Sequence, residues 1–289
     1  MKQVLLIPHV LVQNANALSS PYTIGFPSMT AWFGAVHALE RKLRAHDFFK
    51  RLRMNGATVI CHQINLQTYK DSNDSVYSII GTGNPLDKHG QRSAFVEEAR
   101  CHLTVSLVIE CTGLNPVDQE HFLTTVVHYL MTMKLASGDI LDFESPELLE
   151  ISGSTEFNQL IHRLVPGYCL IERRDLMRQA MENGQDAIDA LLDHLVISHR
   201  CKHDKNGRVK WYSNRKEKGW IVPIAVGFHG ISDLTITANQ RNPDVLHCFA
   251  ESIVTLGEFV MPYRISDLKS LLWHRHVDLK KHFYLYQQI

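Results

Sequence analysis

"NANALSSPYTIGFPSMTAWFGAVHALERKL" (residues 14–43) passes from a small polar run, through a turn containing proline and glycine, into a helical pattern. Ser28 stands at the N-cap position, directly after Pro27. A polar loop that enters a helix leaves the first backbone N–H groups without partners, and such groups bind anions. Spacings of three and four residues predict one apolar helix face, formed by Met29, Trp32, Phe33, Val36, Leu39 and Leu43.

The neighbouring sequence extends this start of a domain in both directions. The predicted helix runs over 28–53 with Gly56 as its stop, and His37, Arg41 and Arg44 share a different face. A buried first strand is expected over 3–13. The clearest strand pattern covers 97–111, where apolar and polar residues alternate. Further strands are predicted over 57–69, 76–80, 219–228 and 234–239, helices over 115–136, 186–199 and 243–259, and a strand followed by a helix within 164–181.

The order of these elements predicts the fold class. A β–α–β unit, a long Gly-, Asn- and Pro-rich excursion over 81–93, and a second β–α–β unit form the split βαβ pattern of ferredoxin-like and RRM-like folds. We therefore expect one α+β domain over 1–289 with a C-terminal α/β extension. Two insertions are expected within it, a long hairpin over 72–98 and a basic loop over 185–218.

Composition limits the class of protein. The 289 residues are 45% hydrophobic, which is enough for a large core. No apolar run reaches 18 residues, and the N-terminal sequence lacks a signal-peptide cleavage region, so we expect a soluble chain with no membrane partner. The six cysteines show no Cys-x-x-Cys spacing, which favours free thiols in a reducing cytoplasm.

The formal net charge is zero, but the charges are segregated along the chain. Residues 1–60 carry seven Lys/Arg against two acids, and 97–160 carry eleven acids against two basic residues. Residues 200–218 return to eight basic residues against two acids. A zero net charge argues against a free-standing nucleic-acid binder held by electrostatics alone. The segregation favours an assembly subunit with one anionic partner and one that is not.

Two kinds of chemistry leave weak signals. His194, His199, Cys201 and His203 lie close together, but a second pair of ligands at zinc spacing is missing, so a metal-stabilised module stays open as an alternative. No Gly-x-Ser-x-Gly, P-loop or Gly-x-Gly-x-x-Gly motif occurs. His37, His62 or His102 could serve as general acid or base in a metal-independent ribonuclease.

Nucleic-acid binding has more support in the sequence. The basic stretch 200–218 interleaves Trp211 and Tyr212 with cations, a combination that suits unpaired bases and phosphates, although a surface loop has the same composition. A second group surrounds a predicted strand and consists of Arg163, Tyr168, Arg173 and Arg174.

The opening stretch resembles the start of the Csy-complex subunits of the Cas-five group in type I-F CRISPR systems. That family carries a similar "NANA-SSP-T-GFP" run followed by a "G-VHAL-R" helix. Further matching motifs follow in the family's order: an "NPL" with a later glycine (84–90), "VEEARCHLTVSL" (96–107), "RLVPGYCLI" (163–171), "GWIVPIAVGF" (219–228) and "LLWHRH" (271–276). Residues 185–218 show no clear family pattern.

The resemblance implies a repeat-associated (RAMP) ferredoxin-like subunit without catalytic activity, metal or cofactor. Such a subunit caps the 5′ handle of the CRISPR RNA, pairs with the large subunit, abuts the first backbone subunit, and meets target DNA only indirectly. Its thumb-like hairpin would fall within 72–98. A processing endoribonuclease of the same fold is the alternative. The expected RNA-binding residues are Asn14, Asn16, Ser19, Ser20, Phe26, His37, Arg41, Arg44, Arg92, Arg100, His102, Arg163, Tyr168, Arg173 and Arg174.

Overall fold

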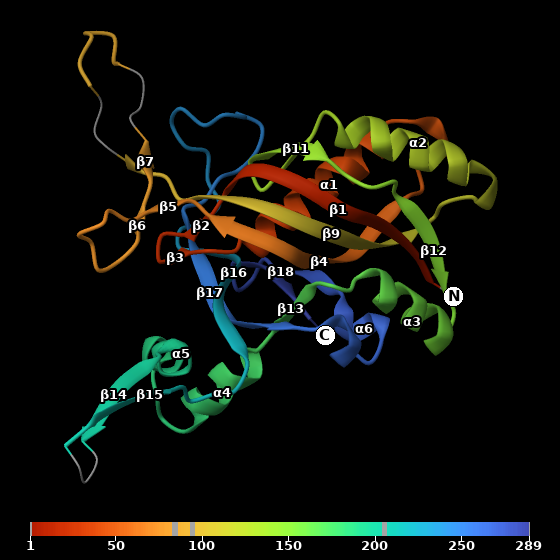
Figure 1. Cartoon of the computed structure of the whole chain (residues 1–289). Helices are drawn as coiled ribbons and strands as arrows, with labels where there is room; N and C mark the ends of the chain where they lie inside the picture. The colour runs from red at the N-terminus through yellow and green to blue at the C-terminus, as the bar shows by residue number, and fades with distance from the viewer. Residues whose placement is uncertain (1, 83–85, 93–95, 204–206, 289) are drawn as a thin grey trace.

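Strand β1 (Lys2–Asn16) lies in an 11-stranded antiparallel sheet that organises the chain (Figure 1). The structure is a computed structural model and describes residues 2–82, 86–92, 96–203 and 207–288. The strand order is β10-β11-β1-β9-β4-β13-β17-β16-β19-β18, and β12 also pairs with β1. The bounds are β4 Arg53–Leu66, β9 Arg100–Thr112, β10 Lys134–Leu135, β11 Gly138–Asp142, β12 Glu147–Ile151, β13 Tyr168–Glu172, β16 Trp220–Gly230, β17 Ala250–Val260, β18 Trp273–Asp278 and β19 Phe283–Gln287.

The three longest neighbours, β1, β9 and β4, form the centre of the sheet. Strand β9 lies between the other two and is antiparallel to both, with Leu5 opposite Ile109 and Val59 opposite Leu107. Strands β11 and β12 flank β1 on its other side. The predicted α+β class is confirmed, since six α-helices accompany this sheet in the described residues.

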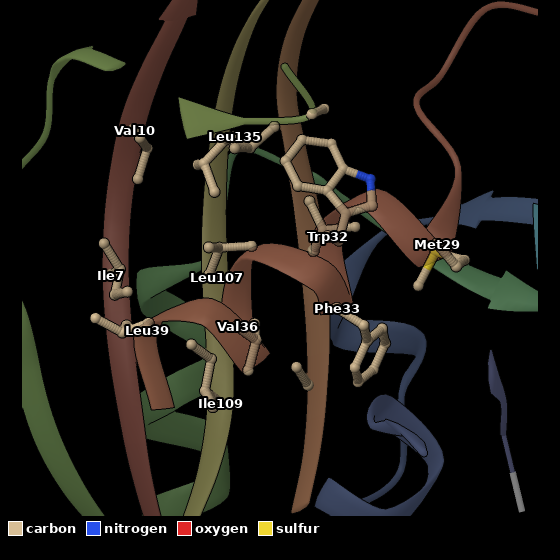
Figure 2. Packing of buried hydrophobic residues seen from close by; sticks show 14 of the residues in the cluster. Ile7, Val10, Met29, Trp32, Phe33, Val36, Leu39, Leu107, Ile109 and Leu135 are labelled. Atoms are coloured by element: carbon tan, nitrogen blue, oxygen red, sulfur yellow. The ribbon is translucent and has the colours of Figure 1, made fainter. Parts of the chain in front are cut away.

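Helix α1 (Met29–Arg44) covers one face of the sheet (Figure 2). The residues of its predicted apolar face are all buried, and Trp32, Val36 and Leu39 pack in one cluster with Ile7 of β1 and Leu107 of β9. Helix α2 (Gln119–Leu130) adds Phe122 and Val126 to the same core. Burial of this face, at about 25 cal/mol per Å² of apolar surface, holds the polar loop 14–28 at the end of the sheet.

The opposite face of the sheet has its own core. Val4, Leu6 and Val108 pack against helix α3 (Ser154–Arg163) and helix α6 (Leu268–Leu271). A third, smaller cluster joins helices α4 (Arg174–Glu182) and α5 (Ala187–Leu195) to Leu256 of β17. Because both faces of β1 and β9 are covered, these strands are buried along most of their length.

Strand β4 pairs with three partners. It lies beside β9 along its length, while its other edge pairs with β13 near Cys61 and with β18 near Ala57. The pairings β4-β13-β17-β16-β19-β18 therefore return to β4 and form a closed ring. This closure brings residues far apart in the sequence to one end of the sheet.

Several sequence-based boundaries are wrong. The first helix ends at Arg44, and a 3-10 turn (η1, Asp47–Phe49) separates it from β4, in which Gly56 lies buried. The helix predicted over 243–259 is mostly replaced by strand β17, which pairs with β13 and β16 on its two edges. Two ladders of tertiary hydrogen bonds outweigh an apolar spacing that suits either element. The strand predicted over 234–239 is reduced to a single bridge, Thr235 with His247.

Two segments leave the sheet (Figure 1). The excursion after β4 carries the short pairs β5–β6 (Thr68–Tyr69 with Ser78–Ile79) and β7–β8 (Gly81–Thr82 with Val96–Glu97). The "NP" of its "NPL" motif lies at 84–85, outside the described residues. The basic stretch 200–218, expected as a loop, forms most of a two-stranded hairpin, β14 (Ser198–His203) with β15 (Val209–Asn214).

Candidate nucleic-acid interface

A largely apolar pocket of about 440 Å³ opens where the polar loop 14–28 meets the sheet. The short hairpin β2 (Leu18–Ser20) and β3 (Thr23–Ile24) leads the chain to one wall of this pocket. Strands β4, β13, β16 and β17 form the other walls. The lining residues are Ile24, Gly25, Phe26, Cys61, His62, Gln63, Ile64, Leu66, Tyr168, Trp220, Val222, Pro223 and Phe259.

Four aromatic rings of this pocket contact one another in a continuous series. Phe26 and Phe259 meet edge to face at 5.3 Å between ring centroids, Phe259 and Trp220 lie 5.3 Å apart, and Trp220 and Tyr168 lie 5.6 Å apart. Trp220 is 49% exposed and Tyr168 38% exposed, so both rings present a surface to the solvent. Aromatic faces of this kind stack against unpaired bases.

None of the described residues that line the pocket is a Lys, Arg, Asp or Glu. Its histidine, His62, has both ring nitrogens occupied: Nε2 lies 2.7 Å from Ser106 Oγ and Nδ1 lies 2.5 Å from the Pro166 carbonyl oxygen. Burial lowers the pKa of His62, which favours the neutral imidazole. A neutral, aromatic pocket suits a base, and a phosphate group would find its partners outside it.

The polar side chains of the loop are largely used within the loop. Asn16 clamps Leu18 from both sides, accepting its N–H at Oδ1 and donating from Nδ2 to its carbonyl. The Ser19 and Ser20 hydroxyls lie 2.8 and 2.7 Å from Thr23 Oγ1, so they hold the β2–β3 turn. These contacts set the path of the chain toward Phe26.

Asn14 belongs to a second, more polar cavity of about 440 Å³. Its walls are Asn14, Gln67, Ile80, Glu98, Arg100 and Ser137. The Asn14 N–H donates to His102 Nδ1 at 3.1 Å, and the Arg100 guanidinium pairs with Glu98 at 2.9 Å. The structure thus brings Asn14, Arg100 and His102 together, and the Asn14 side chain is exposed.

The entrance of helix α1 lies next to Phe26. Ser28 has an extended backbone, its side chain makes no cap hydrogen bond, and the first helical turn has no acidic residue. The indole N–H of Trp32 donates to the Pro27 carbonyl oxygen at 3.2 Å, which fixes the chain just before the helix. Among the described residues, no side chain caps the backbone N–H groups of the first turn, although the Ala31 N–H donates to the Ser28 carbonyl oxygen at 3.0 Å.

The remaining predicted cations differ in their partners. Arg41 and Arg92 are exposed. Arg44 pairs with Glu40 at 3.6 Å, and His37 lies in a small cavity with Arg53 and Arg275.

The arginines of the second predicted group are engaged with carboxylates. Arg163 pairs with Glu147, Arg174 with Glu172, and Arg173 with both Asp175 and Glu258. Hydrogen bonding to Asp175 raises the pKa of Arg173 above its usual range. These three guanidiniums are therefore already neutralised within the chain.

The histidine and cysteine cluster of the sequence is dispersed. His194 is buried on α5, 3.6 Å from Glu217, while His199, Cys201 and His203 follow along the exposed strand β14. Across the residues that the structure describes, no group of three or more His, Cys, Asp or Glu side chains could hold a metal ion.

Sequence reasoning had selected Phe26 and Tyr168 but missed Trp220 and Phe259. Trp220 is the second residue of the quoted motif "GWIVPIAVGF", which was a usable signal. Phe259 lay hidden in a segment assigned to a helix.

The comparisons give the class of this α+β chain: it is a CRISPR-associated protein. The model of the family "CRISPR-associated protein (Cas_Csy2)" matches residues 5–286, and the chain belongs to this family. The CRISPR-associated protein Csy2 of Pseudomonas aeruginosa (strain UCBPP-PA14) is 32% identical over 308 residues, covering 97% of this chain and 93% of the relative. The resemblance to a subunit of the type I-F Csy complex is confirmed.

Neither matched description names a nuclease. Among the described residues, none of the helices combines the length and the hydrophobicity that crossing a membrane requires.

Proposed function

We propose that this subunit binds the 5′ handle of the CRISPR RNA without cutting it, and that the aromatic pocket holds a handle base. The single observation that supports this most is the series Phe26, Phe259, Trp220 and Tyr168 at the end of the polar loop. Unpaired RNA is held by stacking on such rings, at about 1–3 kcal/mol per base.

The handle backbone would run from this pocket toward the second cavity. The N–H groups of Met29 and Thr30 at the α1 entrance, which no side chain caps, supply donors for one phosphate next to Phe26. At the second cavity Asn14 supplies an exposed amide, while Arg100 is already paired with Glu98. In this arrangement the base enters the neutral pocket and the phosphates stay on the polar rim, which matches the charge of each part.

We also propose that the central sheet and its helices form a ferredoxin-like RAMP core. In support, β9 lies between β1 and β4, and β11 and β12 lie on the outer side of β1. Along the chain, α1 lies between β1 and β4, and α2 lies between β9 and β11. This is the strand order of a split βαβ unit. Strands β13, β16, β17, β18 and β19 would be the extension, and 72–98 the thumb that adjoins the neighbouring backbone subunit.

The acidic block 97–160 remains the proposed side for a protein partner, the large subunit. The side chain of Leu141 in this block is 56% exposed, so it adds an apolar contact surface to the negative charge. Recognition of the target sequence would involve this chain only indirectly, through the complex.

A non-catalytic role is proposed over the endoribonuclease alternative, in which His37, His62 or His102 would act, and the contacts of His62 argue against that residue. Its Nε2 faces Ser106, which is fully buried, and its Nδ1 faces a backbone carbonyl. A general acid or base needs a ring nitrogen that can reach the substrate. Incubation with repeat RNA in the absence of metal tests this: cleavage would establish the enzyme.

The handle proposal is tested by replacing Trp220. Handle-RNA affinity of the purified chain, measured by fluorescence anisotropy, should fall roughly tenfold in Trp220→Ala, since one stacking face is lost. Trp220→Phe keeps a ring and should retain most of the affinity. Trp211→Ala on the β14–β15 hairpin is the matched control and should bind as the unchanged chain does. Equal affinity in all four proteins would reject the pocket as the handle site.

A further inference from the structure

The β14–β15 hairpin leaves the body of the protein as an isolated two-stranded ribbon (Figure 1). Apart from Ser198, every residue of its two strands is exposed. Helices α4 and α5, which precede it, are anchored to the sheet through Leu256 and Ile221. The ribbon is thus a projecting arm with a fixed base, and neither of its faces is buried by the described chain.

The register of the ribbon separates its side chains into two different faces. Residues directly opposite each other in an antiparallel pair lie on the same face. Arg200 stands opposite Tyr212 and Lys202 opposite Lys210, so one face carries three cations. The other face carries Trp211 opposite Cys201.

The cationic face is unfavourable for the hairpin itself. Like charges directly opposite each other destabilise a strand pair, and Lys202 and Lys210 are in this position. Strands β14 and β15 contain no Asp or Glu, and none of the three cations forms an ion pair with another described residue. An anionic ligand would remove this repulsion.

We propose that this cationic face binds the sugar–phosphate backbone of duplex DNA. A two-stranded ribbon fits the major groove of B-form DNA, whereas the deep, narrow major groove of A-form RNA does not admit it. Three cations along one strand pair match the regular phosphates that border the groove. The contact is non-specific, because lysines that touch phosphates carry no sequence information.

The same geometry disfavours an unpaired strand as the ligand. Binding of single strands needs aromatic rings beside the cations. On the cationic face the Tyr212 ring is already covered by the Lys202 ammonium, 5.4 Å from its centroid. Trp211 points to the opposite face, so the combination of ring and charge predicted from the sequence is split by the strand alternation.

The test replaces both opposed lysines in the double variant Lys202→Gln/Lys210→Gln. Affinity for a short duplex is measured across a fourfold range of salt, with the assembled complex loaded with a CRISPR RNA that does not match the duplex. Loss of two phosphate contacts should make the log–log salt slope shallower by about 1.8. The unchanged complex should therefore lose about twelvefold more affinity than the variant over this range.

Stability gives a second readout. Removing the opposed charges relieves their repulsion and also removes the Lys202 contact with Tyr212, so the melting temperature of the purified chain should change little and weaker DNA binding would not come from unfolding. Lys280→Gln/Lys281→Gln, in the exposed turn between β18 and β19, changes the net charge equally and should leave the slope unchanged.

The outcomes separate this proposal from handle binding, on which it does not rest. A shallower duplex slope with unchanged handle-RNA affinity supports it. An unchanged duplex slope overturns it, as does an equal loss in the control variant. Loss of handle affinity or of another subunit, with duplex binding intact, would assign the ribbon to RNA or to a protein contact and also overturn it.

Discussion

The imidazole rings of His9 and His62 stack on each other with their centroids 4.3 Å apart and their planes 29° apart. The pair joins β1 to β4 across β9, because the His9 N–H and His62 Nε2 both bond to Ser106 Oγ of β9. Glu144 lies 3.2 Å from His9 Nδ1 without hydrogen-bond geometry. A second proton on the stack would place two positive rings in contact.

This stack predicts a loss of stability in mild acid. Burial, followed by repulsion from His9, lowers the pKa of His62, while Glu144 and the Pro166 carbonyl act in the opposite direction. The folded state therefore takes up its proton at lower pH than the unfolded chain, whose histidine pKa is about 6.5. The contribution of His62 is fully present above that pH and is lost as the pH falls below it.

The measurement is chemical denaturation at neutral pH and at mildly acidic pH, with His62→Gln as the variant. The free energy of unfolding should decrease less in the variant than in the unchanged chain as the pH is lowered. His194, whose pKa is also lowered by burial, contributes equally to both proteins and cancels in the difference. Equal pH dependence would show that the stack does not couple to folding.

A second prediction concerns Gly113, at the end of β9. Its φ is +79°, and a Cβ added there would lie 2.2 Å from the carbonyl oxygen of Arg51. Gly113→Ala should therefore destabilise the chain by about 2 kcal/mol or more, since both strain and a backbone clash are introduced. Gly90 has a similar φ of +73° but open space around it, so Gly90→Ala should cost about 1 kcal/mol. Equal losses in denaturant titrations would mean that the backbone near Arg51 can move aside.

An element could be predicted from the sequence where its own residues favour one secondary structure, and could not where tertiary pairing decides between two. The buried face of α1 was correct at every position because the apolar spacing, the proline before it and Ser28 agree. Strand β9 was correct because its alternation is long. Strand β17 was not, since its apolar residues fit a helix as well as a strand, and only the pairing with β13 and β16 decides between them.

The candidate site shows the same limit. Phe26 could be selected from the sequence because it lies in the opening motif, and Tyr168 because it begins a predicted strand. The pocket itself arises from the ring of pairings that returns to β4, which places Trp220 and Phe259 beside them. No local pattern encodes that closure.

Substitutions of Asn14 and Asn16 should distinguish a side chain that contacts RNA from one that only stabilises the loop. Asn14 has a φ of +56° and an exposed side chain, so Asn14→Gly keeps the backbone conformation and removes the amide. We expect it to weaken handle-RNA binding severalfold with little change in melting temperature. Asn16→Ala removes both hydrogen bonds to Leu18 and should lower stability by about 1 kcal/mol. If Asn14→Gly leaves the affinity intact, the amide does not contact the handle.

The arginines expected near RNA should differ according to their present partners. Arg92 is exposed on the proposed thumb, whereas Arg163 is held by Glu147. A phosphate that takes Arg92 releases counterions, with a log–log salt slope of roughly −0.7 per contact for single strands. Arg163 would first have to leave its carboxylate, and the Glu147 charge left behind would repel the phosphate. Arg92→Gln should therefore make the slope of handle binding shallower by about 0.7, while Arg163→Gln should leave it unchanged. Anisotropy titrations of both variants across a salt series measure this difference, and the reverse ranking would place the RNA on the α3 side of the sheet.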